Sequence, residues 1–213
     1  MSFGTPAPDG QQPDRFEFTP ENLERATAII AKYPDGRQQS AVIPLLDIAQ
    51  RQHDNWLPRA AMDHVADLLQ MPRIRAYEVA SFYTMFNVAP VGRLLVQVCT
   101  TTPCWLCGSD DVLRAIKHRT GLGPGESSDD VTVVEVECLG ACVNAPMVQI
   151  NDDYYEDLDY DRTCVVIDAL RQGVKPDIGS QTGRPGGQAQ AGPTSLRDLQ
   201  PKSGGAAAAD PGD

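Results

Sequence analysis

The sequence predicts an α+β protein in which an N-terminal helical bundle precedes a domain that alternates strands with helices. Up to about residue 88, apolar residues recur every three or four positions, as they do along one face of a helix. After residue 92 they form short continuous runs, which are typical of buried strands. Such a change of pattern is expected at a domain boundary, and it places the boundary in the segment 87–92.

The two ends of the chain are expected to lack a fixed structure. Residues 1–18 are rich in Pro, Gly and Gln and predict a flexible arm. Half of the residues in 178–213 are Gly, Pro or Ala, and none is aromatic. This segment cannot bury enough apolar surface to offset its ordering entropy, so we expect a disordered tail unless a partner captures it. The domains between these ends are expected at 19–88 and 92–177.

Four helices are expected in the N-terminal domain. Thr19 is a suitable cap for the first helix, and Pro20 fits the first helical position, where no backbone N–H is needed. Turn and break signals follow at 34–36 and at Pro72. The predicted helices cover residues 20–33, 40–53, 58–71 and 74–82.

The order of elements after residue 92 predicts a thioredoxin-like α/β sandwich. A strand, a crossing helix and a second strand make a right-handed parallel unit. The next two strands are separated only by Asn151-Asp152-Asp153, so they must form an antiparallel hairpin. The expected strands cover 94–98, 131–137, 147–150 and 154–155, and the expected helices cover 109–119 and 160–172.

Composition excludes several classes of function. The net charge is −11, and residues 93–177 hold 15 of the 29 acidic residues but only 7 of the 18 basic ones. Such a surface repels a polyanion, so nucleic acid is not an expected partner. No apolar run approaches the roughly 20 residues of a membrane helix, and the N-terminus shows no export signal. Because no Gly-rich phosphate loop follows a strand, we do not expect this chain to bind NADH or a flavin by itself.

Two cysteine pairs organise the second domain. Cys99 and Cys104 follow its first strand, and Cys138 and Cys142 follow its second. The four thiolates are therefore expected to meet at one edge of the sheet, as ligands of an iron-sulfur cluster or of a structural zinc. The spacings favour a 2Fe-2S cluster, because zinc sites more often use pairs that are separated by two residues.

A dithiol active site is a further possibility. Cys104-Trp-Leu-Cys107 follows the first strand, where a thioredoxin-like oxidoreductase keeps its reactive pair. That interpretation leaves three cysteines at strand ends without a role and is therefore less favoured. Cys107 is then expected to be a bystander near the cluster, and Cys164 a core residue of its helix. The three histidines, His53, His64 and His118, are expected at the surface.

Four segments resemble one known family closely. They are Phe82-Tyr-Thr-Met-Phe86, Cys99-Thr-Thr-Thr-Pro-Cys104, Glu137-Cys-Leu-Gly-Ala-Cys-Val-Asn-Ala-Pro-Met147 and Tyr154-Tyr-Glu-Asp-Leu158. These segments look like the 2Fe-2S thioredoxin-like ferredoxin subunit of respiratory complex I, the NADH:quinone oxidoreductase, and the resemblance extends over about residues 18–177. It implies that the cluster ligands are Cys99, Cys104, Cys138 and Cys142, which decides for iron-sulfur over zinc. Cys107 is not a ligand in the family pattern, and the tail lies outside the family core.

The resemblance also implies a function and its partners. The chain would be an electron-transfer subunit without a complete active site of its own, so no catalytic residue is expected in it. Its cluster would exchange single electrons with the FMN of a larger subunit that binds FMN and NADH, alongside other peripheral-arm subunits. The implied location is peripheral, on the cytoplasmic side of a bacterial inner membrane. Two alternatives are the equivalent subunit of an NAD-linked hydrogenase or formate dehydrogenase, and a free-standing thioredoxin-like ferredoxin.

Overall fold

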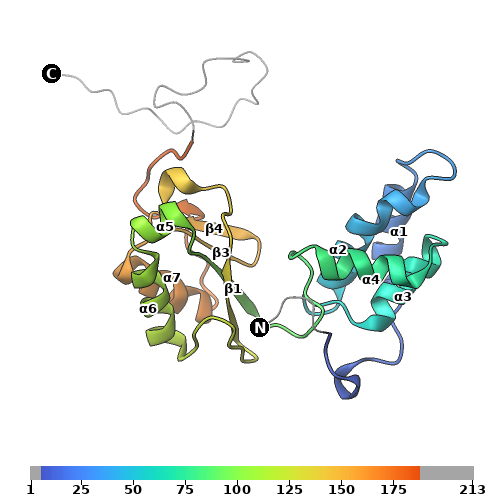
Figure 1. Cartoon of the computed structure of the whole chain (residues 1–213), viewed down its shortest axis with the longest axis horizontal. Helices are drawn as coiled ribbons and strands as arrows, with labels where there is room; N and C mark the ends of the chain where they lie inside the picture. The colour runs from blue at the N-terminus through green and yellow to red at the C-terminus, as the bar shows by residue number, and fades with distance from the viewer. Residues whose placement is uncertain (1–5, 188–213) are drawn as a thin grey trace, which may run out of the picture.

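The computed structural model describes residues 6–187, and its elements fall into two groups (Figure 1). Within this range, four helices between residues 20 and 82 form a helical part, and five strands and three helices between residues 94 and 180 form a sheet part. None of the helices described is both long enough and apolar enough to cross a membrane. Residues 188–213 of the expected disordered tail lie outside the described residues.

The helical part has one hydrophobic core, to which each of its helices contributes buried side chains. The core is centred on Leu45, Leu46 and Val65, which are fully buried. Thr19 caps the first helix as predicted, because its hydroxyl accepts a hydrogen bond from the backbone N–H of Asn22 at 3.3 Å. The helices are α1 (Pro20–Ile30), α2 (Val42–Gln52), α3 (Arg59–Leu68) and α4 (Arg73–Phe82), with 3-10 turns η1 (Asp9–Gln11) and η2 (Gln38–Ala41).

Residues 6–18 differ from the flexible arm that their composition predicts. Phe16 and Phe18 are buried against the helical core, with their ring centroids 5.5 Å apart in an edge-to-face arrangement. Both rings also pack on His64, at 5.7 and 5.2 Å. Two aromatic side chains supply enough apolar surface to fix a segment that is otherwise rich in Pro, Gly and Gln.

Only one of the three histidines is exposed, as the sequence predicts for all of them. His118 is exposed, as predicted, and its Nδ1 lies 2.7 Å from the hydroxyl of Tyr160. His53 and His64 are instead half-buried beside the aromatic rings of Phe16 and Trp56. The expectation of surface histidines is therefore wrong for these two, because residues 6–18 cover them.

The sheet part has five strands in the order β2-β1-β3-β4-β5. As predicted, the first two strands pair in parallel, and the third and fourth form an antiparallel hairpin. The longer helices pack together on one face of the sheet, around a core that includes Val96, Ile116 and Ile167. The opposite face is turned toward the helical part (Figure 1). The elements are β1 (Leu94–Cys99), α5 (Thr102–Leu106), α6 (Ser109–Thr120), β2 (Val131–Val136), η3 (Cys142–Asn144), β3 (Val148–Ile150), β4 (Asp153–Glu156), α7 (Tyr160–Arg171) and β5 (Gly179–Ser180).

Strand β5 lies where the sequence predicts a disordered tail. It pairs in parallel with β4, so that Gly179 lies opposite Tyr155 and Ser180 opposite Glu156. Hydrogen bonds rather than apolar burial hold this segment, which is why its composition does not reveal it. The predicted onset of disorder at residue 178 is therefore wrong for residues 178–187.

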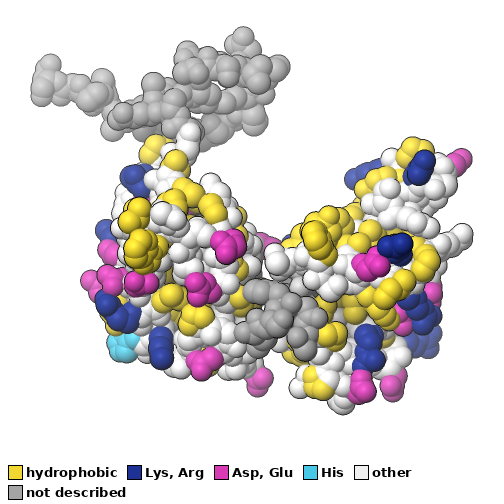
Figure 2. All heavy atoms as spheres, viewed as in Figure 1, with side chains coloured by type: hydrophobic (Ala, Val, Ile, Leu, Met, Phe, Trp, Pro, Cys, Tyr) yellow, Lys and Arg dark blue, Asp and Glu magenta, His cyan; other side chains and the backbone are white. Residues whose placement is uncertain are grey.

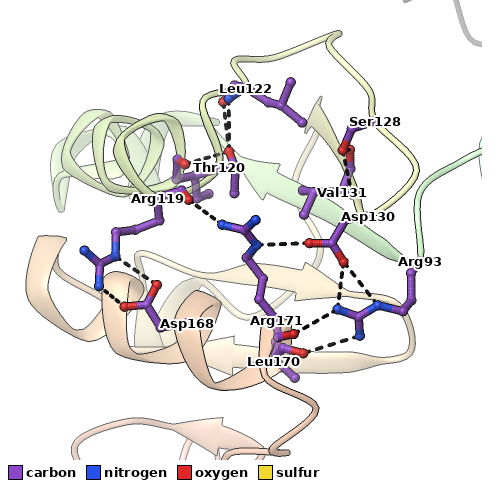
Figure 3. Close-up of polar contacts among 11 residues, drawn as sticks. Arg93, Arg119, Thr120, Leu122, Ser128, Asp130, Val131, Asp168, Leu170 and Arg171 are labelled. Carbon is purple, nitrogen blue, oxygen red and sulfur yellow. Dashed lines mark hydrogen bonds and ion pairs between the residues drawn. The ribbon is translucent and has the colours of Figure 1, made fainter.

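An ion-pair network closes the sheet at the end away from the cysteines (Figure 3). Asp130, just before β2, accepts hydrogen bonds from Arg93, just before β1, at 2.7 Å and from Arg171, at the end of α7, at 3.0 Å. Arg119 and Asp168 join the C-terminal halves of α6 and α7 beside it. Because β1 and β2 are parallel, their N-terminal ends lie together at this network. Their C-terminal ends lie together at the edge of the sheet that carries the cysteines.

The segment that joins the two parts is fixed by Gln50 and Gly92. The buried amide of Gln50 donates to the carbonyl of Met85 at 3.0 Å and accepts from the N–H of Asn87 at 2.7 Å. A Cβ added to Gly92 would lie 2.6 Å from the backbone nitrogen of Val131, so only glycine fits there. These contacts bring the chain from α4 to the start of β1.

Candidate metal centre

The first cysteine pair is buried at the finishing end of β1. Cys99 is the last residue of the strand, and Cys104 lies in α5. Both are 1% exposed and pack against Met147. The hydroxyl of Thr101 lies 3.2 Å from the Sγ of Cys99. Burial, and then the hydrogen bond with Cys99, raise the pKa of the Cys104 thiol to about 12.

The second pair lies in the loop after β2 and is exposed. The Sγ atoms of Cys138 and Cys142 are 3.3 Å apart. The backbone N–H of Gly140, whose φ of +85° favours glycine, donates to the Sγ of Cys138 at 3.4 Å. This hydrogen bond is the main cause that lowers the pKa of Cys138, whereas the contact with Cys138 raises the pKa of Cys142.

The two pairs influence each other across the edge of the sheet. Besides the larger effects given above, negative charge on Cys99 raises the pKa of Cys104 and of Cys142. Thiolates at this spacing repel one another, and a cationic centre is what would hold all four ionised together.

The four thiols are a donor set that fits a 2Fe-2S cluster. All six cysteines are free thiols, so none of the four is engaged in a disulfide. A cluster of two irons takes two thiolates at each of two positions, and two cysteine pairs at one edge of the sheet can supply them.

Strand β4 supports the second cysteine loop. The hydroxyl of Tyr154 donates to the carbonyl of Leu139 at 2.9 Å. Asn144, buried in the loop, donates through its side chain to Glu156 at 2.8 Å. The peptide bond Ala145–Pro146, whose isomer the sequence leaves open, is cis. The loop is thus tied to the sheet after each of its cysteines.

The two remaining cysteines are not buried. Cys107 is exposed directly after α5, and Cys164 is half-buried on α7 rather than in the core. Trp105, next to Cys104 in α5, is 58% exposed. Leu106 and Val143 are also exposed beside the cysteine loops, and apolar atoms gather on the surface in the region of α5 (Figure 2).

Sequence reasoning missed two residues that support the second loop. Arg184 donates to the carbonyl of Val143 at 3.0 Å and pairs with the buried carboxylate of Asp157. Asp157 has a weak local signal, since it lies two residues after the predicted strand 154–155 and within a segment that resembles the family. Arg184 has none, because it lies in a segment that its composition assigns to the tail.

Comparisons with known proteins agree on one family. Residues 26–171 match the family described as thioredoxin-like 2Fe-2S ferredoxin. The E subunit of NADH-quinone oxidoreductase from Rickettsia bellii is 56% identical over 158 residues, which cover 73% of this chain and 95% of the relative. The mitochondrial NADH dehydrogenase (ubiquinone) flavoprotein 2 of Dictyostelium discoideum is 48% identical over 198 residues, which cover 92% of this chain and 79% of the relative.

A solved structure shares the fold. An NAD+-reducing NiFe-hydrogenase in its H2-reduced state matches with a TM-score of 0.53 and 22% identity, over 62% of this chain and 22% of that chain. This chain therefore spans about a fifth of the hydrogenase chain, and at this identity the likeness concerns the fold alone. The family match and the relatives of high identity establish that the chain belongs to the thioredoxin-like 2Fe-2S ferredoxin family, with relatives named as the E subunit of NADH-quinone oxidoreductase.

Proposed function

We propose that this chain is the 2Fe-2S electron-transfer subunit of an NADH:quinone oxidoreductase, respiratory complex I. The observation that carries the proposal is the set of four free thiols in two pairs at one edge of the sheet. The 56% identity to the E subunit of NADH-quinone oxidoreductase from Rickettsia bellii supports the same conclusion, because the match covers 95% of that subunit.

Cys99, Cys104, Cys138 and Cys142 would hold the 2Fe-2S cluster. When bound, the cluster accepts and releases one electron at a time. The N–H of Gly140 points at the Sγ of Cys138, where it stabilises negative charge on that ligand. The first pair is buried and would shield its side of the cluster from water, whereas the second pair is exposed.

A partner subunit that binds FMN and NADH carries out the oxidation of NADH. The helical domain (19–88) and the cluster domain (92–177) dock on this partner and on other subunits of the peripheral arm. Exposed Trp105, Leu106 and Val143 support a protein partner at the cysteine edge, because an apolar patch beside a functional site marks an interaction surface. The assembled arm lies on the cytoplasmic side of a bacterial inner membrane.

The alternatives have weaker support. The likeness to the NAD+-reducing hydrogenase rests on 22% identity, against 56% for the Rickettsia bellii relative. A free-standing ferredoxin has no evident use for α1–α4, which form a core of their own.

Electron transfer from NADH within the complex tests the proposal. The chain is co-expressed with the FMN-binding flavoprotein from the same genome, and low-temperature EPR is recorded after addition of NADH. We expect NADH to produce the 2Fe-2S signal in the complex but not in this chain alone. A complex in which dithionite reduces the cluster and NADH does not would overturn the assigned role.

A further inference from the structure

Residues 177–187, here called the C-terminal strap, run from the edge of the sheet to the second cysteine loop. Strand β5 begins the contact by pairing with β4, and the N–H of Gln181 donates to the carbonyl of Glu156 at 3.0 Å. The backbone N–H of Arg184 then donates to the hydroxyl of Ser180 at 3.0 Å, which turns the chain back toward the loop.

The side chain of Arg184 reaches two groups at once. Its Nη2 donates to the carbonyl of Val143 at 3.0 Å, and Val143 directly follows Cys142. Its Nε donates to the carboxylate of Asp157 at 3.0 and 3.1 Å. The guanidinium thus links the main chain beside a cysteine to a carboxylate at the end of β4.

Asp157 is the centre of this arrangement. Its side chain is 8% exposed and accepts hydrogen bonds from Arg184 and from the hydroxyl of Ser180. Its backbone N–H donates to the carbonyl of Asn144 at 2.8 Å. Asn144 directly follows Val143 in the second cysteine loop. Burial opposes ionisation of this carboxyl, but the hydrogen bonds outweigh it and hold its pKa below the ordinary value.

We propose that the C-terminal strap positions the second cysteine pair, with Arg184 fixing the main chain of Val143 and thereby the thiol of Cys142. The inference rests on the proposed function, because it takes Cys142 to be a cluster ligand. Arg184 is a positioning residue, since it acts on the ligand through the main chain. Cys142 is exposed, so no packed core restrains it as Met147 restrains the first pair.

The proposal depends on the geometry of arginine rather than on its charge alone. A planar guanidinium can donate to the carbonyl of Val143 and to Asp157 in one plane, whereas the ammonium of a lysine is a point charge. Arg184→Lys therefore keeps the ion pair with Asp157 but loses the hydrogen bond to the carbonyl of Val143. Arg184→Gln loses both.

The test uses the full chain with its cluster reconstituted anaerobically. Arg184→Gln and Arg184→Lys are compared with Arg75→Gln, which removes an arginine from an exposed pair with Glu78 in α4. The measurements are the EPR line shape after reduction, the rate of cluster loss to an iron chelator and the unfolding temperature. Ser180→Ala is the milder variant if Arg184→Gln does not fold. It removes the hydroxyl that donates to Asp157 and accepts from the backbone N–H groups of Thr182 and Arg184, but it leaves the guanidinium of Arg184 in place.

We expect both Arg184 variants to broaden the EPR signal and to lose the cluster several-fold faster. Ser180→Ala should change the same two properties to a smaller degree. Arg184→Lys, which keeps the charge beside Asp157, should unfold at a temperature close to that of Arg75→Gln, whereas Arg184→Gln should unfold at a lower one. An Arg184→Lys protein that behaves as wild type would overturn the proposal, because charge alone would then suffice. Arg184→Gln indistinguishable from Arg75→Gln would overturn it as well. A wild-type chain without any 2Fe-2S signal would instead refute the cluster assignment.

Discussion

Arg51 in α2 donates two hydrogen bonds, 2.8 and 3.0 Å long, to the carboxylate of Asp152 in the turn between β3 and β4. The pair joins the helical part to the sheet part beside a cleft of about 430 Å³. Asp47, one turn earlier in α2, accepts from the same guanidinium at 3.0 Å. The helical part is thereby fastened to the sheet through a side-chain pair as well as through the segment 87–92.

Arg51→Ala is expected to loosen the two parts without unfolding either. The side chains of Arg51 and Asp152 are 48% and 68% exposed, so the loss should cost no more than about 1 kcal/mol of unfolding free energy. Small-angle scattering at pH 7 should show a larger radius of gyration than for the wild type. Arg75→Ala, which breaks a pair within one helix, is the control and should leave the radius unchanged. Equal radii for Arg51→Ala and wild type would contradict this role.

The same pair predicts a pH dependence. The hydrogen bond from Arg51 is the main cause that holds the pKa of Asp152 below its ordinary value. A carboxyl whose pKa is lowered by folding contributes stability above its ordinary pKa, and the contribution is lost as the pH falls through the lowered pKa. The difference in radius between wild type and Arg51→Ala should therefore be full at pH 7 and shrink below the ordinary Asp pKa. A difference that persists at the lowest pH at which the chain stays folded would refute this linkage.

Asp130→Asn should weaken the sheet at the end away from the cysteines. The hydrogen bonds from Arg171 and Arg93 lower the pKa of Asp130, so the carboxylate form is the one that folding favours. Because Asp130 is 38% exposed, we expect a loss of only about 1 kcal/mol, measured by urea unfolding at pH 7. Glu78→Gln, in a single exposed pair, should cost less. An EPR signal of the reduced cluster that changes in Asp130→Asn would argue against the separation of the two ends.

Gly92→Ala should be among the most destabilising small substitutions in the chain. The new Cβ would lie 2.6 Å from the backbone nitrogen of Val131 and 2.7 Å from the carbonyl oxygen of Ser128, so the main chain must shift. Overpacking of this kind costs about 1–3 kcal/mol, and contact with backbone on two sides favours the upper end. Gly10→Ala, whose Cβ would meet nothing within 4 Å, is the control and should change stability by no more than about 0.5 kcal/mol. Urea unfolding should show the larger loss of unfolding free energy in Gly92→Ala, and equal losses in the two variants would contradict this reason.

Local patterns predicted the elements that carry their own signal. The helices of the first 88 residues and the first four strands follow from apolar periodicity, and Thr19 from its capping chemistry. The short helix α5 was missed, because five residues that include a cysteine and a proline give no periodicity. The packing of Phe16 and Phe18 was missed because it depends on His64, which lies more than 40 residues away.

The candidate site also has a part that local patterns predict and a part that depends on contacts distant in sequence. The cysteine pairs and their common edge could be predicted because parallel strands finish together. The supports from the C-terminal strap could not, because Arg184 and Ser180 reach the loop only through the pairing of β5 with β4. A two-residue strand that contains glycine has no pattern of its own, and its partners decide its conformation.

The EPR spectrum of the isolated chain shows directly whether its cysteines hold a 2Fe-2S cluster. The chain is purified anaerobically, reduced with dithionite and measured at low temperature beside Cys107→Ser and Cys138→Ser. We expect a spin-half signal of about one spin per chain, from a 2Fe-2S centre with its four thiolates. The signal should persist in Cys107→Ser and should shift or disappear in Cys138→Ser. An EPR-silent chain that contains zinc and no iron would contradict the account and leave a structural metal site in its place.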